Sequence, residues 1–211
     1  MVDALERYHA NASSAHSAGL ECRMAIERSR RTLADVLKCD ISELVFTSSA
    51  SESNLMSIWG LWLSRTEGHP ERRQIITSPL EHNSVYENLM FLKNRFGAEV
   101  IFAPLTDAGT IDVAALETLM DPEKVAFVTT IGAHNEVGIV QPWQEIAALS
   151  EAKGIPFHVD LVQCFIRESL DLGKSKVSAV TLCFHKSGGP KGVGLLYIRN
   201  KTKLEPLVRG G

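Results

Sequence analysis

The chain has 211 residues, with 22 Lys and Arg against 25 Asp and Glu, so its formal net charge is −3. This balance excludes the basic surface that nucleic-acid binding requires, while a hydrophobic share of 45% is typical of a globular chain. The longest apolar stretch, residues 55–63, is far shorter than the roughly 20 residues of a membrane-spanning helix. Four cysteines without CxxC spacing predict neither a metal site nor disulfides, and the N-terminus lacks a signal peptide. We expect a soluble, cytoplasmic protein with no nucleic-acid or membrane partner.

The apolar pattern predicts one long helix followed by alternating strands and helices. In residues 17–37, apolar side chains recur at helical spacing, which predicts an amphipathic helix with one buried stripe: Leu20, Met24, Leu33, Val36 and Leu37. Seven short apolar runs predict strands at Leu44–Thr47, Gln74–Thr77, Glu99–Phe102, Val125–Thr130, Pro156–Asp160, Ala179–Cys183 and Val193–Ile198. Four further helices are expected at Glu52–Ser64, Ser84–Arg95, Val113–Met120 and Pro142–Lys153.

This alternation predicts an α/β fold with a mainly parallel seven-stranded sheet that carries helices on both faces. The last strand follows the turn Gly188-Gly189-Pro190, which leaves no room for a crossover helix, so an antiparallel strand beside its predecessor is expected. No linker or internal repeat divides the sequence. We therefore expect residues 1–211 to form a single domain.

Polar residues follow several of the predicted strands directly. In open α/β sheets the ligand lies at the carboxyl ends of the strands, so these residues are the candidates for a binding site. The segments contain hydroxyl groups, histidines, amides, a carboxylate and a lysine: Ser48–Glu52, Ser78–His82, Gly132–Glu136, Asp160–Gln163 and Phe184–Pro190. Such a collection predicts a polar site at one edge of the sheet.

Together, these segments resemble the cysteine desulfurases, which are fold-type I enzymes of the class V aminotransferase group and depend on pyridoxal 5′-phosphate (PLP). The resemblance implies the fold of a PLP-dependent transferase-like large domain and PLP as cofactor. It runs from residue 11 to the end of the chain. The motifs that carry it, in this order and spacing, are Phe46–Ser53, Thr77 to Glu81-His82, Asn135–Gly138, His158-Val159-Asp160 with Gln163, and His185-Lys186.

The resemblance implies two catalytic residues and a partner for the cofactor ring. Lys186 matches the lysine that forms a Schiff base with PLP, although a solvated loop lysine is the usual fate of this residue type. His82 matches the histidine that stacks on the ring and moves protons, and imidazole suits both tasks. Asp160 matches the carboxylate that keeps the pyridine nitrogen protonated, whereas alone it would be read as a turn residue.

The same resemblance implies the remaining cofactor contacts. Asn135 and Gln163 match side chains that hydrogen-bond the phenolic oxygen of PLP, with ordinary loop amides as the alternative. Ala50 and Ser51 would bind the phosphate at a helix N-terminus, where the helix dipole favours an anion, although a plain helix cap is compatible with the same residues. Cys183 and His185 match further phosphate ligands.

Three positions depart from the family pattern and predict weakened cofactor affinity. Ser49 replaces a usual glycine, which matters if the position needs a positive φ. Cys183 replaces a serine, and a thiol is a weak hydrogen-bond donor. Phe184 replaces another glycine and is expected to place a bulky ring near the phosphate. Cys164 is the one cysteine near the site, but its apolar neighbours favour an inert, buried residue over a nucleophile.

In the enzymes that this chain resembles, sulfur is taken from L-cysteine, leaving alanine and an enzyme persulfide that supplies iron–sulfur cluster or thio-cofactor assembly. The expected partners are therefore a small amino-acid substrate, a second copy in a homodimer and a sulfur-acceptor protein. Family members carry the nucleophilic cysteine in a small C-terminal domain, which is expected to be absent from residues 1–211. Two alternatives stay open: a truncated or degenerate PLP-binding fragment without catalysis, or another class V enzyme such as a selenocysteine lyase or an aminotransferase.

Overall fold

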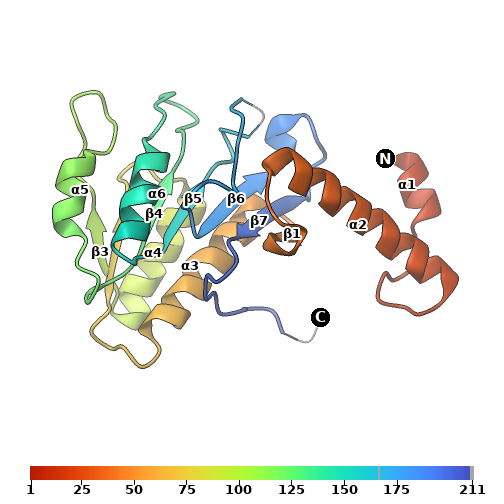
Figure 1. The fold of residues 1–211 in the computed structure, drawn as a ribbon, viewed down its shortest axis with the longest axis horizontal. Helices are drawn as coiled ribbons and strands as arrows, with labels where there is room; N and C mark the ends of the chain where they lie inside the picture. The colour runs from red at the N-terminus through yellow and green to blue at the C-terminus, as the bar shows by residue number, and fades with distance from the viewer. Residues whose placement is uncertain (166, 210–211) are drawn as a thin grey trace.

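Seven strands form one sheet in the computed structural model, which describes residues 1–165 and 167–209. Their order across the sheet is β1-β7-β6-β5-β4-β2-β3 (Figure 1). The central strands β4, β5 and β6 are buried along their whole length, as expected for strands covered on both faces. The strands are β1 (Leu44–Thr47), β2 (Gln74–Thr77), β3 (Glu99–Phe102), β4 (Val125–Ile131), β5 (Phe157–Asp160), β6 (Ala179–Cys183) and β7 (Gly194–Ile198).

The helices also lie close to their predicted positions, with bounds that differ by no more than two residues. A short helix at the N-terminus, α1, and two single-turn 3-10 helices were not predicted. In the described residues, no helix combines the length and the apolar character needed to cross a membrane. The helices are α1 (Val2–Arg7), α2 (Ser17–Leu37), α3 (Ala50–Thr66), α4 (Asn83–Phe96), α5 (Val113–Leu119), α6 (Trp143–Ala152), η1 (Ile41–Glu43) and η2 (His185–Ser187).

Strand direction brings the carboxyl ends of six strands to one edge of the sheet. The neighbours from β3 through β2, β4 and β5 to β6 are parallel. Strand β7 is antiparallel to β6, which confirms the prediction for the last strand, and it is also antiparallel to β1. Strand β1 therefore runs in the same direction as β6. The segments that follow β1, β2, β3, β4, β5 and β6 consequently emerge at the same edge.

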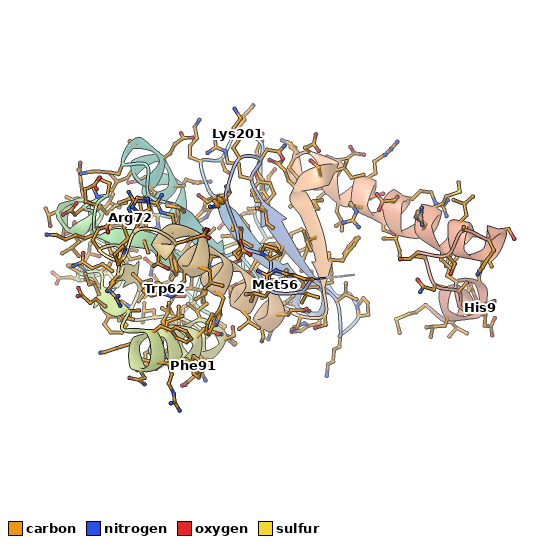
Figure 2. All side chains as sticks on the ribbon, turned by 90° about the horizontal axis from the view of Figure 1, so that it is seen from below. His9, Met56, Trp62, Arg72, Phe91 and Lys201 are labelled. Carbon is orange, nitrogen blue, oxygen red and sulfur yellow. The ribbon has the colours of Figure 1, made fainter. Side chains whose placement is uncertain are left out.

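Helices cover both faces of the sheet, as predicted. Ile75 on β2 and Phe127 on β4 belong to a buried cluster with residues of α3 and α4, such as Leu89. The next residue of each strand, Ile76 and Val128, points to the other face, where the buried cluster contains residues of α5 and α6. Figure 2 shows α3 and α4 on one side of the sheet and α6 on the other. The alternation follows from the two-residue period of a strand.

The buried stripe predicted for α2 is wrong over much of the helix. Leu20, Met24 and Val36 are 50%, 53% and 58% exposed, whereas the predicted Leu37 is buried and Leu33 packs against the core. Figure 1 shows α1 and the N-terminal part of α2 projecting away from the sheet, so only the C-terminal end of α2 reaches the core. The residues that α2 does bury are Gly19, Cys22, Ala34 and Leu37.

Candidate functional site

A cavity of about 270 Å³ lies at this edge, beyond the ends of β1, β2, β4, β5 and β6. Every residue that was predicted to bind PLP or to act in catalysis lines it: Ala50, Ser51, His82, Asn135, Asp160, Gln163, Cys183, His185 and Lys186. Four further residues complete the lining, namely Ser49, Ser84, Ile131 and Val162. Ser49 and Val162 belong to the segments Ser48–Glu52 and Asp160–Gln163, which were predicted to lie at the site, whereas Ser84 and Ile131 were not predicted. Ser84 lies in the first turn of α4, beyond the predicted segment, and Ile131 ends β4 as an apolar residue that carries no polar signal.

The N-terminus of α3 provides backbone donors on one side of the cavity. The Ser49 hydroxyl accepts the Glu52 N–H at 3.1 Å, while the Glu52 carboxylate accepts the backbone N–H of Ser48 at 2.5 Å and its hydroxyl at 2.6 Å. The N–H groups of Ala50 and Ser51 belong to the first turn and have no partner within the helix. With the helix dipole behind them, they form an anion-binding position.

Serine at position 49 does not strain this turn. Its φ is −168° and its ψ is 165°, which is extended backbone that any residue adopts. Position 49 therefore does not need the conformational freedom of a glycine. Serine was expected to weaken cofactor binding only if the position required a positive φ, and it does not.

Asp160 presents a buried carboxylate at the end of β5. The residue is 4% exposed, and its two oxygens accept hydrogen bonds from the Asn54 side-chain amide at 2.9 Å and from the Val162 N–H at 3.0 Å. Burial raises the pKa of Asp160, although both hydrogen bonds oppose the shift. Within residues 1–165 and 167–209, Asp160 forms no ion pair with Lys or Arg. A carboxylate in this position is stabilised by a cationic ligand atom.

His82 is the N-cap residue of α4, so its ring is fixed by the helix that it begins. Its Nδ1 atom accepts the Ser84 N–H at 3.1 Å and lies 2.8 Å from the Ser84 hydroxyl. The ring itself is exposed and lines the cavity. This geometry holds the imidazole at the cavity wall, where a planar ligand can pack against it.

Glu81, for which no role of its own was predicted, has a buried carboxyl group. Its Oε1 atom accepts the Ile131 N–H at 2.8 Å, while Oε2 is buried without a hydrogen-bond partner. Burial raises the pKa of Glu81 well above its ordinary value, and the charge of Asp160 raises it further. Both effects favour the protonated, neutral form of the carboxyl group. Sequence reasoning missed this feature because nothing in the spacing distinguishes a buried glutamate from an exposed one.

Lys186 lies on the single-turn helix η2, immediately beyond the end of β6. Its side chain is exposed and lines the cavity, so its amine is accessible to a ligand. Gly188 ends this turn with a φ of +79°, in the left-handed region that favours glycine. The turn thus returns the chain toward β7 and leaves Lys186 at the edge of the sheet.

The two remaining departures from the family pattern have different outcomes. Cys183 is buried and lines the cavity, and burial raises the pKa of its thiol, so it offers only a weak, neutral donor. The expected placement of Phe184 is wrong: its ring does not line the cavity. It packs edge-on against the ring of Phe165, with 5.9 Å between the centroids, because the main chain turns that side chain toward the core.

None of the four cysteines is an exposed thiolate. Cys164 is 1% exposed, and burial raises the pKa of its thiol to about 12. Burial likewise raises the pKa of Cys39 to about 12, while Cys22 is buried in α2. Because the thiolate is the nucleophile, this geometry supports the interpretation of Cys164 as an inert structural residue.

A parallel α/β sheet with a polar cavity at its carboxyl edge defines the class of open α/β proteins that bind small ligands at this position. Within that class, the chain belongs to the class V aminotransferase family, whose model matches residues 1–211. Members of this family, the cysteine desulfurases included, are PLP-dependent.

Three relatives illustrate the similarity. An IscS-like cysteine desulfurase from Mycobacterium tuberculosis is 36% identical over 209 residues, which are 99% of this chain and 53% of the relative. A solved NifS-like protein superimposes with a TM-score of 0.91 at 34% identity, covering 100% of this chain and 57% of the other. The structure of SspA in complex with cysteine has a TM-score of 0.88 at 36% identity, and the match covers 97% of this chain and 58% of SspA. The chain thus spans about half the length of the curated relatives that it matches.

The side chains of this cavity are chemically suited to PLP. Free N–H groups at the start of α3 match a phosphate, and the desolvated carboxylate of Asp160 matches a protonated pyridine nitrogen. The amine of Lys186 matches an aldehyde carbon, and the flat imidazole of His82 matches an aromatic ring. Each group of the cofactor therefore has a complementary residue at the cavity.

Proposed function

We propose that residues 1–211 form a PLP-binding domain of cysteine desulfurase type. The observation that carries the proposal is the convergence of all the predicted site residues on one cavity, with the buried carboxylate of Asp160 and the accessible amine of Lys186 both at its surface. When bound, PLP supplies a ring that withdraws electrons from the Cα atom of an amino-acid substrate.

In this proposal each residue has a defined task. The N–H groups of Ala50 and Ser51 bind the phosphate, and Asp160 holds a proton on the pyridine nitrogen. Lys186 would hold the cofactor, and its Nζ atom would be the base that removes the Cα proton. His82 packs on the ring. The amides Asn135 and Gln163 hydrogen-bond the phenolic oxygen, and Cys183 and His185 contribute to the phosphate site.

The proposed substrate is a small amino acid, with L-cysteine as the first choice. Curated relatives bear the name cysteine desulfurase, and one solved relative is described in complex with cysteine. The proposed reaction leaves alanine and transfers sulfur to an enzyme cysteine, for delivery to an acceptor protein in iron–sulfur cluster or thio-cofactor assembly. These names favour a desulfurase over a selenocysteine lyase or an aminotransferase. The proposed setting is a cytoplasmic homodimer.

A PLP titration tests the cofactor half of the proposal. We expect purified protein to develop the visible absorbance of lysine-bound PLP and the Lys186→Ala variant to lose it. Lys191→Ala is the matched control, because Lys191 is an exposed lysine of the same loop that does not line the cavity, and this variant is expected to keep the absorbance. Absence of the band from the wild-type protein at saturating PLP would contradict the proposal.

A further inference from the structure

Asn54 connects two of the proposed cofactor residues through its side-chain amide. Its Nδ2 atom lies 2.9 Å from Oδ2 of Asp160 and 2.8 Å from the hydroxyl of Ser84. The Ser84 hydroxyl in turn lies 2.8 Å from Nδ1 of His82. A continuous hydrogen-bonded bridge therefore runs from Asp160 through Asn54 and Ser84 to His82.

The chemistry of the groups fixes the direction of every hydrogen bond in this bridge. An amide NH₂ group has two donors and no acceptor, so Asn54 donates both to Asp160 and to Ser84. Having accepted from Asn54, the Ser84 hydroxyl directs its own proton to His82. The bridge therefore delivers a donor to Nδ1 of the imidazole.

The backbone makes the same demand on His82 independently. The N–H of Ser84, which can only donate, also points at Nδ1, at 3.1 Å. A ring nitrogen that faces two donors must keep its lone pair, so the proton of the neutral imidazole resides on Nε2. No hydrogen bond to Nε2 is found within residues 1–165 and 167–209, and the ring lines the cavity.

We propose that Asn54 and Ser84 are positioning residues that hold His82 in the Nε2–H form while orienting the carboxylate of Asp160. His82 then presents a hydrogen-bond donor to the cavity and has no free ring lone pair with which to take a proton. The acceptance of the substrate Cα proton is thereby left to Lys186 alone, a consequence that rests on the proposed function. This assignment is narrower than the ring-stacking and proton-moving role expected for His82 from sequence.

Nitrogen NMR of histidine-labelled protein without PLP tests the bridge directly, with His82→Gln used to assign the signals. In the wild type at pH 8, we expect Nδ1 of His82 to show the shift of an unprotonated nitrogen and Nε2 that of a protonated one. Ser84→Ala removes one of the two donors that face Nδ1. Because one hydrogen bond is lost, the ratio of the Nε2–H to the Nδ1–H tautomer of His82 is expected to fall severalfold. Ser150→Ala, which removes a buried helix hydroxyl from α6, is expected to leave the ratio unchanged.

Asn54 is tested with two variants, because the residue is fully buried. Asn54→Asp replaces the donor by an acceptor, which turns the Ser84 hydroxyl toward the carboxylate and raises the Nδ1–H population. Should that variant fail to fold, Asn54→Leu removes the donor without adding charge and is expected to lower the tautomer ratio and to weaken PLP binding about tenfold. Asn88→Leu is the control, since the Asn88 amide contacts the Ser84 carbonyl and not its hydroxyl.

The NMR measurement needs no cofactor, so the bridge and the proposed function can fail separately. Protonated Nδ1 in the wild-type protein would overturn the inference, as would tautomer ratios that do not change in Ser84→Ala and in whichever Asn54 variant folds. An expected tautomer together with no binding of PLP would retain the bridge and reject the proposed function.

Discussion

The charge of Asp160 raises the pKa of Glu81, whose carboxyl group is already disfavoured as an anion by burial. The two groups are not equivalent, because Asp160 accepts hydrogen bonds on both of its oxygens, whereas Glu81 accepts on one and leaves the other buried without a partner. A carboxylate is stabilised by each donor that it meets. The hydrogen bonds therefore favour the anion on Asp160 over the anion on Glu81.

Replacing Glu81 by glutamine should reveal the raised pKa of Glu81 through the pH dependence of stability. The pKa of Glu81 is raised in the folded protein. The stability that Glu81 contributes is therefore fully present below pH 4.5, and it is lost as the pH rises toward the pKa of Glu81 in the folded protein. Glu81→Gln should therefore gain stability over wild type with rising pH, by at most about 1.4 kcal/mol per unit. Urea unfolding at pH 5 and pH 8 measures the gain. Glu145→Gln, at an exposed position, is the control. If Glu81→Gln and this control both differed from the wild type by the same free energy of unfolding at pH 5 and at pH 8, the raised pKa of Glu81 would be contradicted.

His158 should make the protein sensitive to acid. The ring lies between Thr129 Oγ1 at 2.8 Å and Thr181 Oγ1 at 3.0 Å, and burial lowers the pKa of His158 to about 3. A depressed pKa gives stability that is present above the unfolded value of 6.5 and is lost as the pH falls toward 3. The loss is at most about 1.4 kcal/mol per unit in this window.

The variant His158→Gln keeps hydrogen-bonding groups between the two threonines but cannot titrate. We expect the free energy of unfolding of the wild type to fall between pH 6.5 and pH 4.5 more steeply than that of the variant. His9→Gln serves as the control, because His9 is exposed and should leave the wild-type slope unchanged. Parallel pH profiles for wild type and His158→Gln would show that the buried ring is not the source of the acid sensitivity.

Asp160→Asn should weaken PLP binding without removing the fold. The amide keeps the shape of the side chain but loses the negative charge that a protonated pyridine nitrogen needs. An opposite charge at contact distance shifts a pKa by roughly 1–3 units, which corresponds to a loss of affinity of about 10- to 1000-fold. Fluorescence or absorbance titration measures the dissociation constant. Asp107→Asn changes an exposed carboxylate in the loop after β3 that does not line the cavity, and this variant is expected to bind PLP as the wild type does.

The 211-residue chain produced alone should release no more alanine and sulfide from cysteine than free PLP at equal concentration. Each of its cysteines is buried or half-buried, and burial raises the pKa of Cys164 to about 12, so no ready thiolate is available. The assay compares sulfide release by the PLP-loaded chain and by free PLP in the presence of a reductant. A faster rate that disappears in Cys164→Ser would make Cys164 the nucleophile.

The sequence allowed the strands and the strand-end residues to be predicted because both depend on local patterns. Short apolar runs bounded by polar turns locate strands such as β2 and β6 to the residue, and the directions of the strands bring their ends to one edge. The strand pattern predicted only a polar site at this edge, and the PLP roles of individual side chains came from the resemblance to the cysteine desulfurases.

Features that depend on tertiary packing could not be predicted in the same way. Leu20 and Met24 have helical spacing, but they are exposed because this part of α2 projects beyond the sheet. The spacing of apolar residues in a helix does not show which part of the helix packs against the sheet. Asn54 and Asp160 are 106 positions apart, so their hydrogen bond exists only once α3 packs beside β5. The extended backbone of Ser49 likewise follows from the cap that it forms rather than from its residue type.

PLP is expected to bind in this cavity through Lys186. Reduction of the PLP-loaded chain with borohydride, followed by proteolysis and mass spectrometry, tests it most directly, because reduction makes a lysine–pyridoxal linkage permanent at the residue that carries it. We expect a single major modified peptide with the pyridoxyl group on Lys186, and loss of that modification in Lys186→Ala but not in Lys191→Ala. Modification spread over surface lysines, or centred on Lys191, would contradict it.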